Sequence, residues 1–428
     1  MKLEIQNIGK IERASIQIDG ITLIGGENNT GKSTISKSLF SIFNSFFLLP
    51  DTIVKIKRNF IEHCSKNLYK AISTEFFLPS KREADKINDL SNIIFNSVDL
   101  LFKASNSVEF LKEVLTGFDD RFAILENSVL SDTIDDLKSK LSITDIKLRE
   151  AIINASLKDE FNGQITSIYN NDSGSITLTT KNQEVKVEIK ENDDSTDIQV
   201  DCPANFYYST DSVYIDDPHV LDMIDFGFHI ISNPLNSEHR QHLIKQLNAQ
   251  VNAESVINIQ ETEKLKAIYE KISLVCSGDL IKENNNKNTY RRPNSDKSLN
   301  VQNLSTGLKT FVILKKLIMN GTIKEQSTII LDEPEIHLHP KWQISLAEII
   351  VLLQKEFNLH ILLNSHSPYF IRAIQAYSKK YSIEKKCRFY LALLENDKAV
   401  FNEVSSDIEL IYEKLADPIQ TLENVWWN

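Results

Sequence analysis

The chain of 428 residues has only 4 cysteines, and no two of them are closely spaced. They are Cys64, Cys202, Cys276 and Cys387. This scarcity argues against zinc fingers and a disulfide framework, and it favours a reducing compartment. No apolar run approaches the length of a membrane-spanning helix, and Met1–Ile5 is typical of a strand rather than of a signal peptide. We therefore expect a cytoplasmic protein without a membrane partner.

Basic residues are also in the minority, with 48 Lys and Arg against 59 Asp and Glu, for a net charge of −11. With this balance the molecule as a whole is not an electrostatic clamp for nucleic acid. Any such contact needs a local patch or comes through a complex. One candidate patch is Lys55, Lys57 and Arg58, and another is Arg291-Arg292. Both are also typical of a solvated surface.

A complete phosphate-binding motif begins at Gly26, between the apolar segment Ile21–Ile24 and the amphipathic run Ile35–Phe43. A strand, a glycine-rich loop and a helix are the context that G-x-x-x-x-G-K-[ST] requires. Backbone N–H groups and the helix N-terminus would bind phosphate oxygens, Lys32 would neutralise the β- and γ-phosphates, and Ser33 would bind Mg²⁺. The residues predicted to hold ATP and Mg²⁺ are Gly26, Glu27, Asn28, Asn29, Thr30, Gly31, Lys32, Ser33 and Thr34.

A second apolar segment, Ser327–Leu331, ends in Asp332 and Glu333. Acidic residues at the carboxyl end of a buried parallel strand face the crevice where open α/β sheets bind ligands. We predict that Asp332 binds Mg²⁺, directly or through water. Glu333 is the predicted general base that polarises the attacking water. A solvated acidic turn is the alternative interpretation of this pair.

Two further segments complete the set of motifs. Leu304–Lys309 opens a helical run, so Ser305 and Gly307 lie near a helix N-terminus, where anions bind. His366 follows the apolar segment His360–Leu363, where it can donate a hydrogen bond to a γ-phosphate or hold the hydrolytic water. A single histidine in such a place is more often structural, but the order of the motifs favours a functional role. The predicted catalytic residues are Glu333, His366 and Lys32.

The phosphate loop, the serine motif, the Asp-Glu pair and the histidine, in this order, resemble the ATP-binding-cassette ATPases over about residues 1–40 and 200–390. The resemblance implies a nucleotide-binding head in which the serine motif of one copy closes over the nucleotide of another. Ser305 and Gly307 would then contact the γ-phosphate of ATP held at Lys32 of a second copy. Thr306 and Leu308 replace the glycine and glutamine of the common Leu-Ser-Gly-Gly-Gln form.

Longer stretches are similar to the overcoming-lysogenization-defect (OLD) and RecF-like ATPases and to the ATPase subunits of the antiphage systems Septu and PARIS. These stretches are the Gly-Glu-Asn-Asn phosphate loop, Asp332–Pro340, Asn364–Phe370 and Ser212–Pro218. The resemblance implies an ATPase that pairs with itself head to tail, as a dimer or a larger oligomer. It also implies a separate effector protein, a nuclease, and a setting in defence against phage.

Each of three further features has two possible interpretations. His337 and His339 have H-x-H spacing, but two ligands are too few for a metal site; we favour a structural role in a loop that meets the neighbouring subunit. The family's γ-phosphate-sensing glutamine is either Gln164 or lies in the segment after Ile215. The two tryptophans of Val425–Asn428 are a packed cap or an anchor for a partner, and we favour the cap.

Apolar spacing and breakers predict the organisation of the chain. The expected regions are the N-terminal part of the head at 1–40 and 160–225, a helical insertion at 41–159, a helical segment with a polar loop at 226–297, and the C-terminal part of the head at 298–428. The predicted fold class is α/β, a P-loop ATP-binding-cassette head with a large helical insertion and an antiparallel β region.

The insertion has neither a sustained heptad repeat nor a C-x-x-C pair, which argues against the long coiled coil of SMC-like ATPases. We expect a compact lobe for subunit contacts or partner docking; the alternative is that it completes the core. No D-x-D pair follows His366, so an OLD-type nuclease is not predicted within this chain. The alternative functions are a DNA-repair ATPase that binds DNA directly and a nucleotide-gated scaffold with little turnover.

Overall fold

The structure is a computed structural model that describes residues 1–72, 81–167, 172–180, 183–192, 195–203, 206–225, 238–249, 259–283 and 287–427. The chain divides into two compact units. The larger unit combines Met1–Phe47 with Ala151–Asn428, and the smaller unit is Leu48–Glu150. Among the described residues, no helix has both the length and the apolar character needed to span a membrane.

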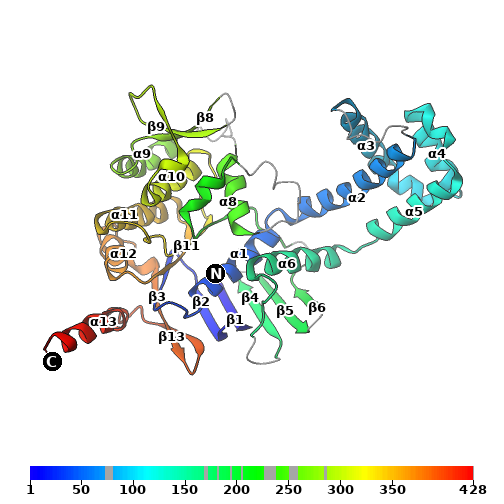
Figure 1. Ribbon diagram of the computed structural model, residues 1–428. Helices are drawn as coiled ribbons and strands as arrows, with labels where there is room; N and C mark the ends of the chain where they lie inside the picture. Colours follow the sequence, from blue (N-terminus) through cyan, green and yellow to red (C-terminus); the bar gives the residue numbers. More distant parts are fainter. Residues whose placement is uncertain are drawn as a thin grey trace. The chain divides into compact units, whose positions relative to one another are not determined.

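The larger unit is built on one large mixed sheet (Figure 1). Its strands are β1 (Lys2–Ile8), β2 (Ile11–Gln17), β3 (Ile21–Gly26), β4 (Gly174–Thr179), β5 (Glu184–Asn192), β6 (Ser195–Asp201), β7 (Ser212–Ile215), β11 (Thr328–Asp332), β12 (His360–Ser365), β13 (Cys387–Glu395) and β14 (Lys398–Glu403). Their order is β6-β5-β4-β1-β2-β14-β13-β3-β12-β11-β7. Strands β13, β3, β12, β11 and β7 run parallel. Strands β1, β2, β4, β5 and β6 pair antiparallel, which confirms the predicted α/β class with an antiparallel region.

Burial separates the two halves of the sheet. Every residue of β3, β7 and β11 is buried, as expected for parallel strands with both faces covered by helices. Strand β4 alternates buried and half-buried residues, the pattern of a strand with one face on the core. The pattern of apolar residues in each strand therefore shows whether one or both of its faces are covered.

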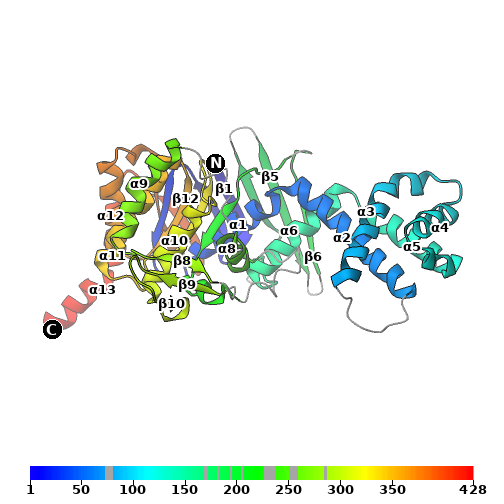
Figure 2. The ribbon, with the colours of Figure 1, turned by 90° about the horizontal axis from the view of Figure 1, so that it is seen from above.

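Helices cover both faces of the parallel strands. They are α1 (Lys32–Phe46), α8 (His239–Asn248), α9 (Ile259–Ser273), α10 (Thr306–Met319), α11 (Pro340–Phe357), α12 (Pro368–Lys380) and α13 (Glu409–Trp427), with 3-10 turns at η2 (Pro218–Met223), η4 (Val301–Asn303) and η5 (Glu384–Lys386). Ile329 and Leu331 belong to the main apolar core with residues of α10, α11 and α12. Tyr214, on the opposite face, packs its ring against Phe40 of α1. Helices α11 and α12 lie side by side, with α9 against α11 (Figures 1 and 2).

The smaller unit consists of helices. They are α2 (Leu49–Ile72), α3 (Lys81–Lys103), α4 (Ser107–Phe118), the 3-10 turn η1 (Asp120–Ile124), α5 (Asn127–Leu141) and the first turns of α6 (Asp145–Phe161). Their apolar faces meet in one core that includes Leu90, Leu115 and Leu130. The unit is shorter than the expected insertion 41–159, because residues 41–46 continue α1 and residues 151–161 belong to the larger unit.

A second, three-stranded sheet begins in the region expected to be a helical segment and a polar loop (226–297) and ends just after it. Its strands are β8 (Asp279–Lys282), β9 (Asn288–Arg291) and β10 (Ser298–Asn300). The loop prediction is wrong for β9, because Tyr290 is buried and its hydroxyl accepts a hydrogen bond from the N–H of Gly278 at 2.8 Å. One inward tyrosine among Asn and Lys residues gives too weak a period to predict a strand. Residues 226–237, 250–258 and 284–286 of this region lie outside the described residues.

Candidate functional site

The phosphate-binding motif forms the turn between β3 and α1, as its strand–loop–helix context requires. Asn29 and Gly31 have left-handed backbone angles, with φ of 65° and 80°, which glycine and asparagine adopt at least cost. A Cβ atom on Gly26 would lie 2.4 Å from the carbonyl oxygen of Ala392, so the strand end has room only for glycine. The hydroxyl of Thr30 donates to the carbonyl oxygen of Glu27 at 2.8 Å and closes the turn.

Lys32, the first residue of α1, points its ammonium into this loop. Its Nζ donates to the carbonyl oxygens of Gly26 at 3.0 Å and Glu27 at 2.7 Å, and the residue is 4% exposed. Burial lowers the pKa of Lys32, while the carboxylates of Glu333 and Asp332 raise it. The cation is thus held where phosphate oxygens would replace the two carbonyl groups.

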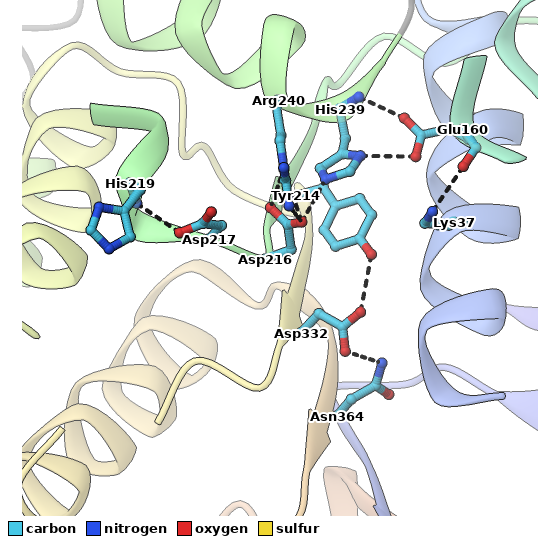
Figure 3. A network of polar contacts seen from close by, with 10 residues as sticks. All are labelled: Lys37, Glu160, Tyr214, Asp216, Asp217, His219, His239, Arg240, Asp332 and Asn364. Carbon is cyan, nitrogen blue, oxygen red and sulfur yellow. Dashed lines mark hydrogen bonds and ion pairs between the residues drawn. The ribbon is translucent and has the colours of Figure 1, made fainter. Parts of the chain in front are cut away.

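Three side chains converge at the carboxyl ends of β7, β11 and β12. Register and alternation place Tyr214, Asp332 and Asn364 on the sheet face that α1 covers. Asn364 Nδ2 donates to Asp332 Oδ1 at 2.9 Å and to Ser36 Oγ at 2.8 Å. The Tyr214 hydroxyl donates to Asp332 Oδ2 at 3.1 Å (Figure 3). Both carboxylate oxygens of Asp332 are therefore fixed from neighbouring strands.

The donor set around Asp332 fits a magnesium ion. Burial raises the pKa of Asp332, and hydrogen bonds from Asn364, Ser33 and Tyr214 lower it. The buried carboxylate of Asp332 accepts a hydrogen bond from the hydroxyl of Ser33, and carboxylate and hydroxyl oxygens are hard ligands of the kind that Mg²⁺ prefers. Asn364 Oδ1 is a buried oxygen without a hydrogen-bond partner among the described residues. Ser33 and Asp332 are the residues predicted to bind the metal, and the structure places their side chains within hydrogen-bond contact of each other.

Glu333 and His366 face each other beside Lys32. Glu333 has a φ of 50°, and its N–H donates to the carbonyl oxygen of Asn364 at 3.0 Å. His366 Nδ1 lies 3.4 Å, and Lys32 Nζ 3.8 Å, from Glu333 Oε1. Hydrogen bonding to His366 lowers the pKa of Glu333, and the same contact raises the pKa of His366. Two residues from separate segments, Lys32 and His366, thus lie beside the ionised carboxylate of Glu333.

Glu335 is a member of the site that the sequence analysis missed. It is 2% exposed and accepts hydrogen bonds from the Ser365 hydroxyl and from the N–H of His366, the latter at 3.2 Å. Burial raises the pKa of Glu335, and the hydrogen bond from Ser365 lowers it. Glu335 thereby anchors the loop that carries His366. Its position two residues after Glu333, inside the same motif, was the available signal.

The serine motif starts helix α10. Ser305 is exposed and immediately precedes the helix, and its carbonyl oxygen accepts from the N–H of Lys309 at 3.1 Å. Gly307 is buried: a Cβ there would lie 2.9 Å from Leu338 Cδ2 and 3.1 Å from the carbonyl oxygen of His337. The glycine therefore permits close packing of α10 on the loop after β11, while the serine stays open to solvent.

His337 and His339 lie against the serine motif. A hollow is lined by Ser305, Thr306, Gly307, His337, His339 and Trp342. His339 also caps helix α11, because its Nδ1 accepts from the N–H of Lys341 at 3.3 Å. His337 adopts a left-handed φ of 67° in the turn before it. The pair thus shapes the surface on which the serine motif lies.

The segment after Ile215 lies at the carboxyl edge beside β11 and carries Asp216 and Asp217. Asp217 lines a hollow together with Glu333 and His337. Gln164, the other candidate for the γ-phosphate-sensing glutamine, is exposed and follows α6. The position of a γ-phosphate-sensing glutamine therefore stays a prediction with both alternatives, and Asp216 and Asp217 are the residues that directly follow β7.

The candidate basic patches are engaged in local contacts. Lys57 pairs with Asp145 at 2.8 Å, and the Arg58 guanidinium lies over the Phe95 ring, 4.1 Å from its centre. Arg291 donates to the hydroxyl of Ser298 at 3.2 Å.

The predicted tryptophan cap is wrong for Trp426, which is 84% exposed. The start of α13 does pack on the unit through buried Ile411, whereas Leu422 and Val425 are exposed further along. The amphipathic end of this helix faces solvent, so apolar composition alone did not indicate burial. The side chain of Trp427 and residue Asn428 lie outside the described part of the chain.

Sequence comparisons relate the chain to known ATPases. The sequence model of the AAA ATPase domain matches residues 1–371. The retron Vc95 probable ATPase of Vibrio cholerae serotype O1 biovar El Tor is 28% identical over 138 residues, 30% of this chain and 26% of that protein. The chain therefore aligns with only about a quarter of the length of this relative.

Two solved structures are similar along nearly the whole chain. The SMC head domain from Thermotoga maritima has 12% identity and a TM-score of 0.39, covering 94% of this chain and 98% of that one. The SmcHead bound to the C-winged helix domain of ScpA has 10% identity and a TM-score of 0.43, covering 96% and 98%.

Proposed function

We propose, for a chain that belongs to the AAA ATPase domain family, that it binds ATP with Mg²⁺ and hydrolyses the γ-phosphate. The observation that carries this proposal is the meeting of Lys32, Glu333 and His366 at one edge of the sheet, next to the buried Asp332. Buried ionisable groups with shifted pKa values cost stability and are typical of functional sites.

Each residue of the site has a distinct task. The loop N–H groups and Lys32 hold the phosphates and neutralise the charge that develops on them. Glu333, ionised beside His366, accepts a proton from the attacking water, whose oxygen bonds to the γ-phosphorus as the bond to ADP breaks. Ser33 and Asp332 hold Mg²⁺, which supplies charge neutralisation when bound. His366 donates a hydrogen bond to the γ-phosphate or orients the water.

Catalysis in this proposal needs a second copy of the chain. Ser305 and Gly307 of one copy contact the γ-phosphate bound at Lys32 of the other, in a head-to-tail pair that can extend to a larger oligomer. The exposed position of Ser305 at the N-terminus of α10 supports this, because free N–H groups there suit an anion. The histidine pair beside it would form part of the same contact.

The pair would act as the ATPase subunit of a bacterial antiphage system of the OLD or RecF-like group, similar to those of Septu and PARIS. Nucleotide binding would control a separate nuclease, through which any contact with nucleic acid is made. The motifs Asp332–Pro340 and Asn364–Phe370 support this assignment, as does the likeness to the retron Vc95 probable ATPase. The local pairing of Lys57 and Arg58 does not favour direct binding of DNA.

The test is ATP binding by Lys32→Ala, measured by calorimetry with exposed Lys55→Ala as the matched control. Loss of the buried ammonium weakens binding by about a hundredfold or more, whereas the control matches the wild type. Tight ATP binding by Lys32→Ala would overturn the assignment of the loop. In the same preparations, light scattering should show ATP-dependent pairing that Ser305→Arg abolishes. DNA-stimulated hydrolysis with a steep salt dependence would instead support the DNA-repair function.

A further inference from the structure

Asp332 is held by a neighbour to which the sequence analysis assigned no role. Tyr214 of β7 is 1% exposed, and its hydroxyl donates a hydrogen bond to Asp332 Oδ2 at 3.1 Å. Because β7 and β11 are parallel and in register, the tyrosine points along the same sheet face as the carboxylate. A phenol on a buried strand has two side-chain torsions and little freedom, so its hydroxyl is a fixed donor.

Tyr214 is in turn fixed by a histidine on α8. The ring of His239 stacks on the tyrosine ring, with centroids 4.2 Å apart and an angle of 26° between the planes. The ring of Phe40 contacts both rings, with centroid distances of 5.7 Å to Tyr214 and 6.1 Å to His239. Figure 3 shows His239 beside the tyrosine ring and Asp332 at its hydroxyl.

Two carboxylates hold His239 from opposite sides. Its Nδ1 lies 2.8 Å from Glu160 Oε2, and its Nε2 lies 3.1 Å from Asp216 Oδ2. The side chains of His239 and Glu160 are 6% and 0% exposed. Burial lowers the pKa of His239, but its bonds to Asp216 and Glu160 prevail and raise it to about 9. The imidazole is therefore a buried cation that pairs with two carboxylates, those of Glu160 and Asp216.

Both carboxylates are themselves held in place. Arg240 donates to Asp216 Oδ2 at 2.6 Å, at the end of β7. Glu160 lies at the end of α6, and its backbone carbonyl oxygen accepts from Lys37 of α1 at 2.8 Å. The imidazolium thus ties α6, α8 and β7 together directly behind Tyr214.

We propose that Tyr214 and His239 are positioning residues for the metal-binding carboxylate of Asp332. The tyrosine hydroxyl sets the rotation of the carboxylate, and the stacked imidazolium, clamped by Glu160 and Asp216, keeps the tyrosine ring in place. This inference rests on the proposed function, since it concerns the Mg²⁺ that accompanies ATP. Packing alone does not require a charged histidine here, because an apolar residue would fill the same space with a smaller desolvation penalty. The proposal gives His239 a role that explains its burial.

The first experiment removes only the hydroxyl, in Tyr214→Phe. Metal affinity of the ATP-loaded protein is measured with Mn²⁺ as a paramagnetic probe and by calorimetry with Mg²⁺. Loss of one hydrogen bond to a charged acceptor weakens metal binding by about tenfold. Metal-free ATP binding and the thermal midpoint stay close to those of the wild type.

Tyr208→Phe is the matched control. Its hydroxyl is buried and has no hydrogen-bond partner within the described part of the chain, and its ring stacks on Phe43 with centroids 4.2 Å apart. The control should bind the metal as the wild type does. Equal metal affinity in Tyr214→Phe and the wild type would overturn the inference while leaving the ATPase proposal intact. Failure of the wild type to bind metal with ATP would instead overturn the proposed function.

The second experiment tests the histidine by a double-mutant cycle. His239→Gln should weaken Mn²⁺ binding about threefold to tenfold, and the double variant with Tyr214→Phe should be no weaker than Tyr214→Phe alone. Additive losses, or no loss in His239→Gln, would show that the histidine does not act through the tyrosine. If His239→Gln does not fold, Asp216→Asn takes its place in the cycle, with the same non-additive result expected.

Discussion

The carboxyl edge of the parallel strands and the helical unit Leu48–Glu150 bury different kinds of side chain. At the edge, Lys32, Asp332 and Glu335 are 4%, 7% and 2% exposed. The core of the helical unit is made of residues such as Leu115, 0% exposed, and its ion pairs lie at the surface. Desolvated charges weaken a fold unless their partners are well placed, so they are retained where chemistry needs them.

The difference indicates that residues of the helical core are selected for packing, whereas buried charged residues at the carboxyl edge are selected for chemistry. Helix α6 belongs to both regions, since it begins in the helical unit and ends with Glu160 in the larger one. Substitutions in the helical core should therefore change stability and spare nucleotide binding. Substitutions at the edge should change turnover and spare stability.

The largest expected effect is on turnover in Glu333→Gln. Removal of a general base lowers kcat by about 10³-fold, while the affinity for ATP with Mg²⁺ stays within about threefold. Steady-state hydrolysis and equilibrium binding measure the two quantities. Exposed Glu325→Gln, close before β11, is the control and should keep full activity. Unchanged turnover in Glu333→Gln would favour the nucleotide-gated scaffold and break the contrast between the regions.

Leu115→Ala should lower the unfolding free energy of the helical unit by about 3 kcal/mol, because a fully buried side chain leaves a cavity. Denaturant melts give the stability, and calorimetry gives ATP affinity, which should not change. The control is Leu100→Ala, a residue of α3 that is 62% exposed, with little effect on either. Loss of ATP binding in Leu115→Ala would show that the two regions do not divide their tasks in this way.

The stability of the larger unit should fall by about 2–3 kcal/mol as the pH rises from 6.5 through about 9. His239 has a folded pKa above its ordinary value of 6.5, so the folded state binds more protons in this window and loses its advantage as they leave. The groups that face the imidazole are Glu160, Asp216, Tyr214 and Arg240. Denaturant titrations across pH measure the slope.

Two variants sharpen this pH prediction. His239→Gln should flatten the slope, because the titrating cation is gone. His219→Gln, at a histidine whose side chain is 52% exposed, should retain it. A wild-type slope in His239→Gln would assign the pH dependence to another group.

The smallest effect is expected at the end of α13. Trp426→Ala should change the unfolding free energy by less than about 0.5 kcal/mol, because the side chain is 84% exposed. Trp342→Ala should cost more, since its ring packs edge-on against Phe311 with centroids 5.9 Å apart. Thermal or denaturant melts compare the two. A large loss in Trp426→Ala would restore the packed cap.

The parallel strands were predictable because buried parallel strands are continuous apolar runs. The expected Ser327–Leu331 became β11 (Thr328–Asp332), and the expected His360–Leu363 became the start of β12. The carboxyl ends of parallel strands share one edge of the sheet, so the proximity of Glu333 and His366 followed from their places at the ends of two such strands. The fold class followed in the same way.

Contacts between distant segments were not predictable from local patterns. His239 and Glu160 meet only through the packing of α8 on the end of α6, and neither stands in a motif. Tyr214 lies in the stretch Ser212–Pro218, to which the resemblance assigned no separate role, and nothing in its neighbours shows which face of the strand carries the hydroxyl. Strand β9 and the exposure of Trp426 were missed because both predictions relied on local composition, whereas tertiary packing decides these features.

The tight fit at Gly307 has a consequence for how two bound nucleotides communicate. With no space for a Cβ between α10 and the turn at His337 and Leu338, helix and turn must move as one piece. That turn continues from Glu333, which in the proposed function would serve the chain's own ATP, whereas Ser305 would serve the ATP of a second copy. In such a pair the occupancy of one pocket would influence the other, so we expect sigmoidal ATP saturation curves that become hyperbolic in Gly307→Ala.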